Sequence, residues 1–409
     1  MAVIMVILIY FKKIKNKETP NEISEHSMDQ MKSGTGFKVP VLTFVKGLLE
    51  GQPDRISSNI DLKRQTHNMS YDTKREIDRS SFTIDDEIGR GTFGKVYKGT
   101  LVGLYDPQST TSVAIKSIHT PGYEKDLNDL MGEIKIMSRI EPHLNLVSMI
   151  GSSTTELKEH GKLYLLIEYC EYGDLRNYLI NNKAKILSGN PDDVLNSRCL
   201  IRWAYDIAKG MQYLSENRIM HGDLATRNVL MGEGFSMSEC PVPKVADFGL
   251  AKNFYDKTKY AKENRLFVPW KWMALEYLLD EYFTLKSDVW SYAVLIWEML
   301  SFGRDPYGKQ DYDEVLPKLE NGYRLPCPKD TDWVSSWSPK TLYKILSEKC
   351  FVENPEKRAT FSDVVQIIEK LLHAEEKTQY TEKEKIYQET RAKNYLRIGR
   401  RGRKFSQQR

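Results

Sequence analysis

A glycine-rich turn between two strand-like segments limits the folds open to this chain. Gly89, Gly91 and Gly94 form a G-x-G-x-x-G pattern that follows FTIDDEIG and precedes KVYKGTL. Such a turn lets backbone N–H groups approach phosphate oxygens that side chains would otherwise obstruct. A dinucleotide-binding fold would begin a helix at these glycines. Because Val96 and its neighbours continue as a strand, that fold is excluded.

A lysine ends the next strand-like segment, Val113-Ala114-Ile115-Lys116. A lysine in this position is usually a solvated charge at a sheet edge. Here a segment with apolar residues near helical spacing follows, YEKDLNDLMGEIKIM, and it contains Glu133. An ion pair between Lys116 and Glu133 would hold the ammonium ready for the α- and β-phosphate oxygens of a nucleotide.

Two polar segments follow further along the chain. Asp223 and Asn228 stand five residues apart in HGDLATRN, and Asp247-Phe248-Gly249 begins nineteen residues after Asn228. A surface loop would explain either segment alone. Both of them, in this order and downstream of the glycine turn and Lys116, favour a phosphate-handling site.

Taken together, these motifs resemble a protein kinase catalytic domain, and specifically a tyrosine kinase of the receptor type. GRGTFGKV, VAIK, the helical Glu133, HGDLATRN, DFG and ALE match the kinase signature set in order. The resemblance covers roughly residues 82–372, and its spacing looks closest to the fibroblast-growth-factor-receptor branch. It implies an α+β, two-lobed fold, with a small β-rich N-lobe carrying one main helix and a larger, mainly helical C-lobe.

Three departures from serine/threonine kinases point to tyrosine as the acceptor. Ala225 stands where those kinases commonly place a lysine, and Arg227 instead precedes Asn228. The segment PWKWM at residues 269–273 resembles the platform on which tyrosine kinases hold their substrate. The resemblance therefore implies protein substrates that bear tyrosine.

The resemblance also implies individual roles. Asp223 would orient the substrate phenol and accept its proton, and Arg227 would lie near the γ-phosphate. Asn228 and Asp247 would hold Mg²⁺, with Mn²⁺ as a substitute, because carboxylate and amide oxygens suit these ions. Lys116, fixed by Glu133, would position ATP. The implied ATP-binding set is Ile88, Gly89, Gly91, Gly94, Val96, Ala114, Lys116, Ile167, Glu168 and Cys170, with Ile167 guarding the deeper pocket.

Regulation and structure are implied at further positions. Tyr260 lies where receptor kinases carry an activation-loop phosphotyrosine, and Tyr255 lies five residues earlier. The family usually has an arginine before the catalytic aspartate to pair with that phosphate, but this chain has Gly222. We therefore expect activity to depend only weakly on Tyr260 phosphorylation. Late in the domain, the resemblance pairs Arg358 with Glu276 as a structural contact.

The chain divides into four expected parts. Residues 1–11 are apolar apart from Tyr10 and precede a lysine-rich run. This pattern predicts a shortened membrane span, an interfacial anchor or an apolar terminus without function. Residues 12–81 have a linker composition and are expected to be partly ordered against the body. The kinase domain is assigned to residues 82–373, with the N-lobe at 82–167, the hinge at 168–174 and the C-lobe at 175–373. Residues 374–409 form a charged, helix-favouring tail.

Charge and cysteine content exclude several classes of function. The net charge of +4 comes from basic ends around a slightly acidic body, which argues against a nucleic-acid-binding surface. Five widely spaced cysteines without a C-x-x-C pair predict reduced thiols rather than a disulfide framework or zinc site. The kinase domain is expected to face the cytoplasm, either beside a membrane or free in the cytosol.

Partners and an alternative function remain open. A homodimer for trans-phosphorylation and adaptor proteins that read phosphotyrosine are expected partners. The alternative is a weakly active kinase or pseudokinase scaffold in which Gly222 loosens the catalytic loop. Its tail would offer Tyr380, Tyr387 and Tyr395 as docking sites, although the same tyrosines are equally well read as solvated side chains.

Overall fold

A computed structural model describes most of the chain. The described residues are 42–52, 66–91, 94–188, 194–234, 240–248, 268–328 and 339–406, with side chains to residue 390.

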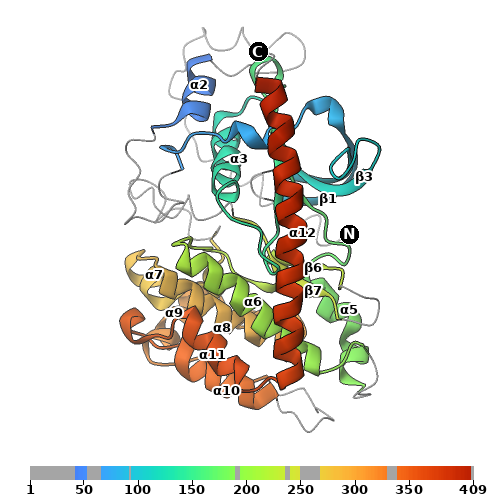
Figure 1. Cartoon of the computed structure of the whole chain (residues 1–409). Helices are drawn as coiled ribbons and strands as arrows, with labels where there is room; N and C mark the ends of the chain where they lie inside the picture. Colours follow the sequence, from blue (N-terminus) through green and yellow to red (C-terminus); the bar gives the residue numbers. More distant parts are fainter. Residues whose placement is uncertain are drawn as a thin grey trace, which may run out of the picture. The chain divides into compact units, whose positions relative to one another are not determined.

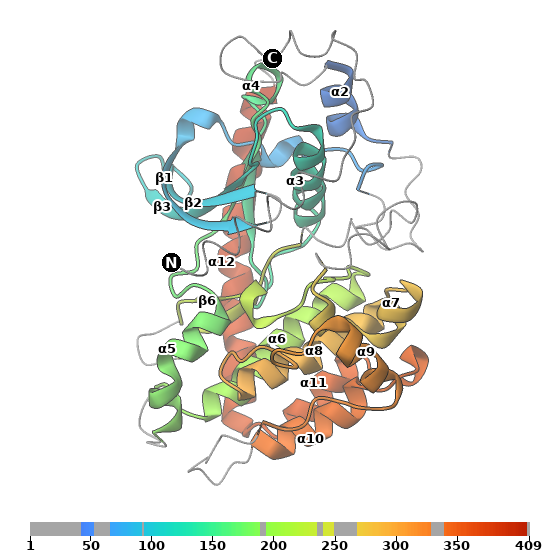
Figure 2. The same cartoon turned by 180° about the vertical axis from the view of Figure 1, so that it is seen from behind.

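One lobe is built on an antiparallel sheet of five strands in the order β1-β2-β3-β5-β4 (Figures 1 and 2). Val113 and Ile115 of β3 are fully buried, because alternation places them on the core face of the sheet. Helix α3 supplies the main helix of this lobe, which confirms the expected small, β-rich lobe. The elements are β1 (Phe82–Gly91), β2 (Gly94–Val102), β3 (Thr110–Ser117), α3 (Glu124–Met137), β4 (Met149–Ser153) and β5 (Tyr164–Glu168).

Parts of the segment before β1 pack against the body of the chain. Helix α2 (Leu42–Glu50) buries Val45 and Leu48 in the main core. Near it, the Tyr71 hydroxyl donates to the Glu76 carboxylate and lies 3.0 Å from Ser152 Oγ of β4. Short turns at Thr73–Arg75 (η5) and Arg79–Ser81 (η6) and the small helix α4 (Leu157–His160) complete this lobe.

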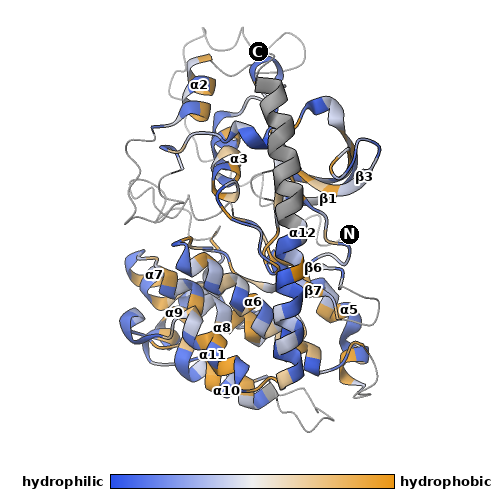
Figure 3. Ribbon diagram, in the orientation of Figure 1, coloured by the Kyte–Doolittle hydropathy of each residue, from blue (hydrophilic) through white to orange (hydrophobic). Residues whose placement is uncertain are grey.

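The other lobe is mainly helical and packs around α8. The segment from Val289 to Phe302 is mostly apolar, and nearly all of its side chains are buried, so it forms part of the core. Figure 3 shows hydrophobic and hydrophilic stretches alternating along α10 and α11, as expected for helices with one face on a core. The elements are α5 (Leu175–Leu187), α6 (Arg198–Glu216), β6 (Val229–Gly232), β7 (Val242–Val245), α7 (Leu275–Asp280), α8 (Leu285–Leu300), α9 (Tyr312–Glu320), α10 (Pro339–Cys350) and α11 (Phe361–Glu369).

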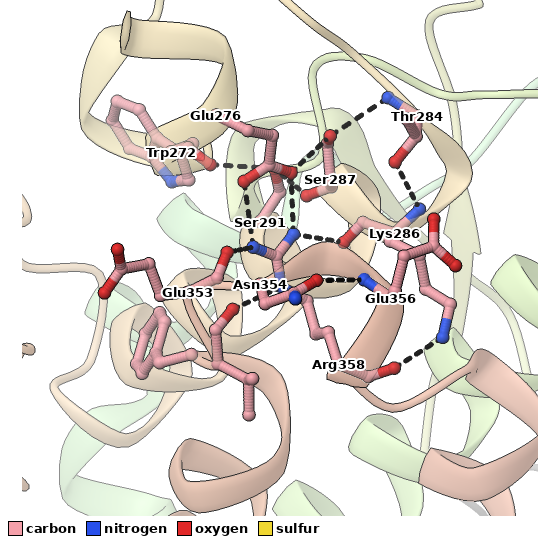
Figure 4. A network of polar contacts seen from close by, with 12 residues as sticks. Trp272, Glu276, Thr284, Lys286, Ser287, Ser291, Glu353, Asn354, Glu356 and Arg358 are labelled. Atoms are coloured by element: carbon pink, nitrogen blue, oxygen red, sulfur yellow. Dashed lines mark hydrogen bonds and ion pairs between the residues drawn. The ribbon is translucent and has the colours of Figure 1, made fainter.

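A buried ion pair joins two distant parts of the helical lobe (Figure 4). The Arg358 guanidinium donates two hydrogen bonds of 2.8 Å to the Glu276 carboxylate. Arg358 also donates to the carbonyls of Val352 and Lys286, and Ser287 donates to Glu276. Every strong donor and acceptor of the pair is therefore used, which is the condition under which a buried ion pair is tolerated.

The C-terminal tail forms one long helix, α12 (Ala374–Ser406). Its coloured part in Figure 3 is mostly hydrophilic, as a solvated tail would be. Yet Tyr380 and Tyr387 are only 7% and 8% exposed and belong to the main core. The prediction of solvated or freely presented tyrosines is wrong for these two, because one face of α12 packs against the body.

The prediction of reduced thiols is wrong for two of the cysteines. Cys199 and Cys240 form a disulfide across 41 residues, with their Cα atoms 6.5 Å apart. Their distance in sequence hides this proximity, since α6 and the segment before β7 come together only in the folded chain. Cys327 and Cys350 are free.

Within the described ranges, no helix combines the length and the apolar character needed to cross a membrane. Residues 1–11, on which the membrane prediction rests, lie outside these ranges.

Candidate active site

The glycine turn joins β1 and β2. Gly89 lies opposite Val96 in the register of the two strands, and Gly91 lies opposite Gly94. A Cβ atom at Gly94 would meet the Ser117 carbonyl oxygen at 2.0 Å, so this position admits only glycine. The turn therefore stays close to the end of β3, which carries Lys116.

Lys116 is the centre of a buried ionic cluster. Its ammonium donates to Glu133 of α3 at 2.7 Å and to Asp247 at 3.3 Å. Burial opposes the charge of Lys116, but the carboxylates of Asp247 and Glu133 outweigh that cost and raise its pKa above the ordinary value. The lysine is therefore held charged between the helix and the aspartate.

The segment around Asp247 has a constrained backbone. Asp247 adopts φ +62°, a left-handed conformation that is costly for a residue other than glycine and concentrates at functional sites. Phe248 is 1% exposed, and its ring lies 5.8 Å from that of His221. His221 in turn contacts the Ala246 carbonyl through Nε2 at 2.8 Å. This packing fixes the direction of the Asp247 carboxylate.

Asp223 lies beside Arg227 and Asn228. The Asn228 side-chain amide donates to the Asp223 carboxylate and to its backbone carbonyl, both at 2.7 Å, and Arg227 donates to the same carboxylate. Burial raises the pKa of Asp223 to about 6, although Arg227 acts in the opposite direction. A carboxylate with this pKa is poised near neutrality, as a proton acceptor requires.

The predicted nucleotide wall is formed by paired strands. In the sheet register, Val96 lies opposite Lys116, and Ala114 lies opposite Ile167. Ile88 is 47% exposed. At the end of β5, the Glu168 backbone N–H donates to the Ser148 carbonyl. Cys170, two residues later, is buried. These residues extend from the glycine turn across β2 and β3 to the end of β5 and the residues just after it.

A family model for protein tyrosine and serine/threonine kinases matches residues 82–368. The chain belongs to this kinase family. The two-lobed fold and the recognised resemblance are thereby confirmed.

Among curated proteins, the kinase is similar to fibroblast growth factor receptors. It is 32% identical to that of Hydra vulgaris over 82% of the chain and 39% of the receptor. It is 30% identical to that of Ciona intestinalis over 92% of the chain and 49% of the receptor. The tyrosine kinase receptor Cad96Ca of Drosophila melanogaster is 33% identical over 73% of the chain and 37% of the receptor. The chain thus spans less than half the length of these relatives.

Two buried acids that the sequence interpretation missed support the loop that contains Asp223. The Asp288 carboxylate accepts from the backbone N–H groups of His221 at 2.7 Å and Gly222 at 2.9 Å. The Glu298 carboxylate accepts from the N–H and hydroxyl of Thr226, at 3.0 and 2.9 Å. Acidic residues within the apolar α8 segment were the available signal, since such residues are seldom buried unless paired.

Glycine suits the backbone conformation at position 222. Its φ is +82°, in the left-handed region that L side chains rarely adopt. Asp288 binds its backbone N–H, so the loop at this position is held rather than loosened.

We expect Gly222→Ala to lower the free energy of unfolding by about 1–2 kcal/mol, because a Cβ atom is strained at this φ. Gly47→Ala is the matched control, since Gly47 lies within helix α2 and a Cβ atom there meets nothing within 4 Å. The control should be neutral or stabilising by about 0.5–1 kcal/mol. Urea denaturation of both variants measures the difference, and equal effects would contradict the strain argument.

The donor set fits a small hard cation. Within the described ranges there is no group of three or more His, Cys, Asp or Glu side chains suited to a metal. Mg²⁺ ordinarily uses only one or two protein carboxylates and completes its shell with phosphate oxygens and water. Asp247 supplies a carboxylate and Asn228 an amide, so these two residues suit Mg²⁺ bound together with a nucleotide.

Three predicted residues lie outside the described ranges: Gly249, Tyr255 and Tyr260. The two regulatory tyrosines therefore stay predictions.

Proposed function

We propose that this chain is a protein-tyrosine kinase, which transfers the γ-phosphate of ATP to tyrosine hydroxyls of proteins. The observation that supports this best is the contact of Lys116 with both Glu133 and Asp247. A lysine so held can neutralise phosphate charge without rearrangement, and phosphoryl transfer depends mainly on such positioning. A scaffold without catalysis has no chemical need for this cluster.

In this proposal, Asp223 orients the acceptor phenol and takes its proton. Its hydrogen bonds from Arg227 and Asn228 fix the orientation of the carboxylate. Lys116 positions the α- and β-phosphates, and the backbone of the glycine turn covers them. Asn228 and Asp247 would hold Mg²⁺, or Mn²⁺ in its place, which neutralises charge on the phosphates when bound.

Tyrosine specificity is supported by an aromatic surface next to Asp223. The Arg227 guanidinium lies 4.3 Å from the ring centroid of Trp272, and the Trp272 indole N–H donates to Glu298. Trp270 stacks on Tyr307, with ring centroids 6.1 Å apart. Such a surface suits an aromatic acceptor, and the relative named as a tyrosine kinase receptor points the same way.

The test is transfer of radiolabelled phosphate from Mg-ATP to a poly(Glu,Tyr) polymer. The wild type should label the polymer, and Asp223→Asn should label it about 10²- to 10⁴-fold more slowly, because the proton acceptor is lost. Equal labelling by both proteins would contradict the proposal. A polymer with serine in place of tyrosine tests the acceptor and should remain unlabelled.

Ile167 is expected to limit access to the space behind the nucleotide. We expect Ile167→Ala to lower the Kd of an ATP-competitive compound with a bulky group directed there by about tenfold or more, since removing methylenes relieves a clash of this size. A compound that stops at the hinge should bind both proteins equally. Unchanged Kd values for the bulky compound would contradict this role.

Activity should depend only weakly on Tyr260. Gly222 offers no side chain to pair with a phosphate at that tyrosine, so one charge-assisted contact is missing. We expect Tyr260→Phe to reduce the rate by less than about tenfold, equivalent to 1.4 kcal/mol. A larger fall in the initial rate on poly(Glu,Tyr) would contradict the hypothesis.

The relatives' names suggest a receptor-like setting, with residues 1–11 attaching the kinase to a membrane and its domain facing the cytoplasm. Trans-phosphorylation within a homodimer would then be the route of activation. Sedimentation with phospholipid vesicles, compared with a chain that lacks residues 1–11, tests the attachment. Adaptor proteins that read phosphotyrosine remain proposed partners, but Tyr380 and Tyr387 are covered while α12 is docked.

A further inference from the structure

Helix α12 is anchored to the large lobe near its start. Glu376 accepts hydrogen bonds from Arg198 of α6. One turn further along α12, the ring of Tyr380 packs edge-on against Tyr205, which also belongs to α6, with ring centroids 5.1 Å apart. These contacts set the direction in which α12 leaves the large lobe, and it continues until its backbone lies beside η5 of the small lobe (Figure 1).

Between these ends, two tyrosine hydroxyls bind the segment that connects α3 to β4. The Tyr380 hydroxyl donates to Asn145 Oδ1 at 2.8 Å. The Tyr387 hydroxyl shares a hydrogen bond of 2.7 Å with Ser148 Oγ. Tyr380 and Tyr387 stand seven residues apart, so they lie on one face of the helix.

Tyr387 also contacts a charge from each side of the hinge. Its hydroxyl donates to Glu168, the last residue of β5, at 3.4 Å. Lys244 of β7 donates to the same hydroxyl at 3.3 Å, and its ammonium lies 4.4 Å from the ring centroid. A single side chain of α12 therefore joins the end of the small-lobe sheet to the small sheet of the large lobe.

Such a contact restrains relative motion of the lobes. Domain closure about a hinge accompanies turnover in enzymes of this kind. Moving Glu168 relative to Lys244 would require Tyr387 to break a contact with one of them.

We propose that Tyr387 is a phosphorylation site that controls the docking of α12. While Tyr387 is unmodified, α12 restrains the hinge; once Tyr387 is phosphorylated, α12 stays detached and the lobes move freely. The inference rests on the proposed function, since a second copy of the chain transfers the phosphate from ATP to Tyr387.

The modification is a simple group transfer. The Tyr387 phenol oxygen forms a bond to the γ-phosphorus of ATP held by the second copy. The bond from that phosphorus to the β–γ bridging oxygen breaks, and ADP leaves with the electron pair. The phenol proton passes to the Asp223 carboxylate of the second copy.

Burial makes docking and phosphorylation mutually exclusive. Tyr387 is 8% exposed, so its hydroxyl reaches another active site only when α12 is detached. A phosphate would add about −1.5 to −2 charge beside the Glu168 carboxylate. Lys244 already pairs with Glu168 at 3.3 Å and donates to the Leu144 carbonyl at 2.8 Å. The modified helix is therefore prevented from returning.

Release of α12 by phosphorylation of Tyr387 can be tested without using the chain's own activity. The Asp223→Asn protein is treated with an added active tyrosine kinase and Mg-ATP, and amide hydrogen exchange is followed by mass spectrometry. We expect phosphate at Tyr387 and exchange about tenfold faster in residues 143–148 and 380–387. No phosphate at Tyr387, or phosphate with unchanged exchange, would overturn the proposal.

Control variants separate the effect of Tyr387 from the effects of other tyrosines and of added charge. Tyr387→Phe in the same background should show no acceleration after the treatment, which separates Tyr387 from every other tyrosine. Tyr387→Glu should accelerate exchange without any kinase, whereas Gln388→Glu, which adds the same charge at an exposed neighbour, should not. Exchange within α8 should be unchanged in all of them, which shows that the fold is intact.

The restraint is tested in the active chain. Tyr387→Glu should label poly(Glu,Tyr) about tenfold faster than Gln388→Glu. Equal rates would overturn the restraint. If neither protein nor the wild type labels the polymer, the proposed function fails, while the exchange experiment still decides whether phosphorylation releases α12.

Discussion

Arg358→Met is expected to lower the free energy of unfolding by about 3–5 kcal/mol. Arg358 is only 1% exposed, and its guanidinium donates to the Glu276 carboxylate and to three backbone carbonyls. Removing it leaves a buried carboxylate charged without its partner, which costs more than the original pair contributes. Methionine keeps much of the volume, so the loss measures charge and hydrogen bonding rather than a cavity.

Arg90→Met is the matched control. Arg90 pairs with Glu87 at 2.7 Å, but its side chain is 64% exposed, so solvent and salt screen the pair and it should contribute little to stability. Urea denaturation followed by circular dichroism compares the two variants. A loss of stability in Arg358→Met no larger than in Arg90→Met would show that the buried pair does not hold the helical lobe together.

Lys116→Met should slow phosphoryl transfer by about 10²- to 10³-fold, the usual cost of removing one preorganised charge from a site. Glu133→Gln should slow it less, by about tenfold, because Lys116 keeps its contact with Asp247 at 3.3 Å. The order of the two effects follows from the geometry, since Glu133 acts only by positioning the lysine.

Initial rates on poly(Glu,Tyr) with Mg-ATP measure both variants. Lys344→Met removes a lysine from the exposed side of α10 and should leave the rate unchanged. Equal loss in Glu133→Gln and Lys116→Met would mean that the contact with Asp247 does not hold the lysine by itself.

Much of the fold could be predicted because its signals are local. The strands around the glycine turn and helix α3 were each indicated by periodicity and turn residues within a short window. The order of Lys116, Asp223 and Asp247 along the chain then indicated the site.

Other features depend on which segments meet in space. Asp288 and Glu298 lie on α8, far in sequence from the loop that they support. Only the hydrogen bonds of the folded chain show that they bind its backbone. Cys199 and Cys240 are 41 residues apart, and their spacing matches no disulfide motif.

The sequence by itself indicated the proposed chemistry of this protein: a glycine turn, a lysine, two aspartates and an asparagine occur in the order that phosphate handling in a kinase requires. Only the tertiary structure decided the role of the tail. Periodicity shows that residues 374–406 can be helical, but the same charged composition suits a solvated helix. Tyr387 becomes a hinge contact because Glu168 and Lys244, more than 140 residues away, offer a buried polar site on which it packs.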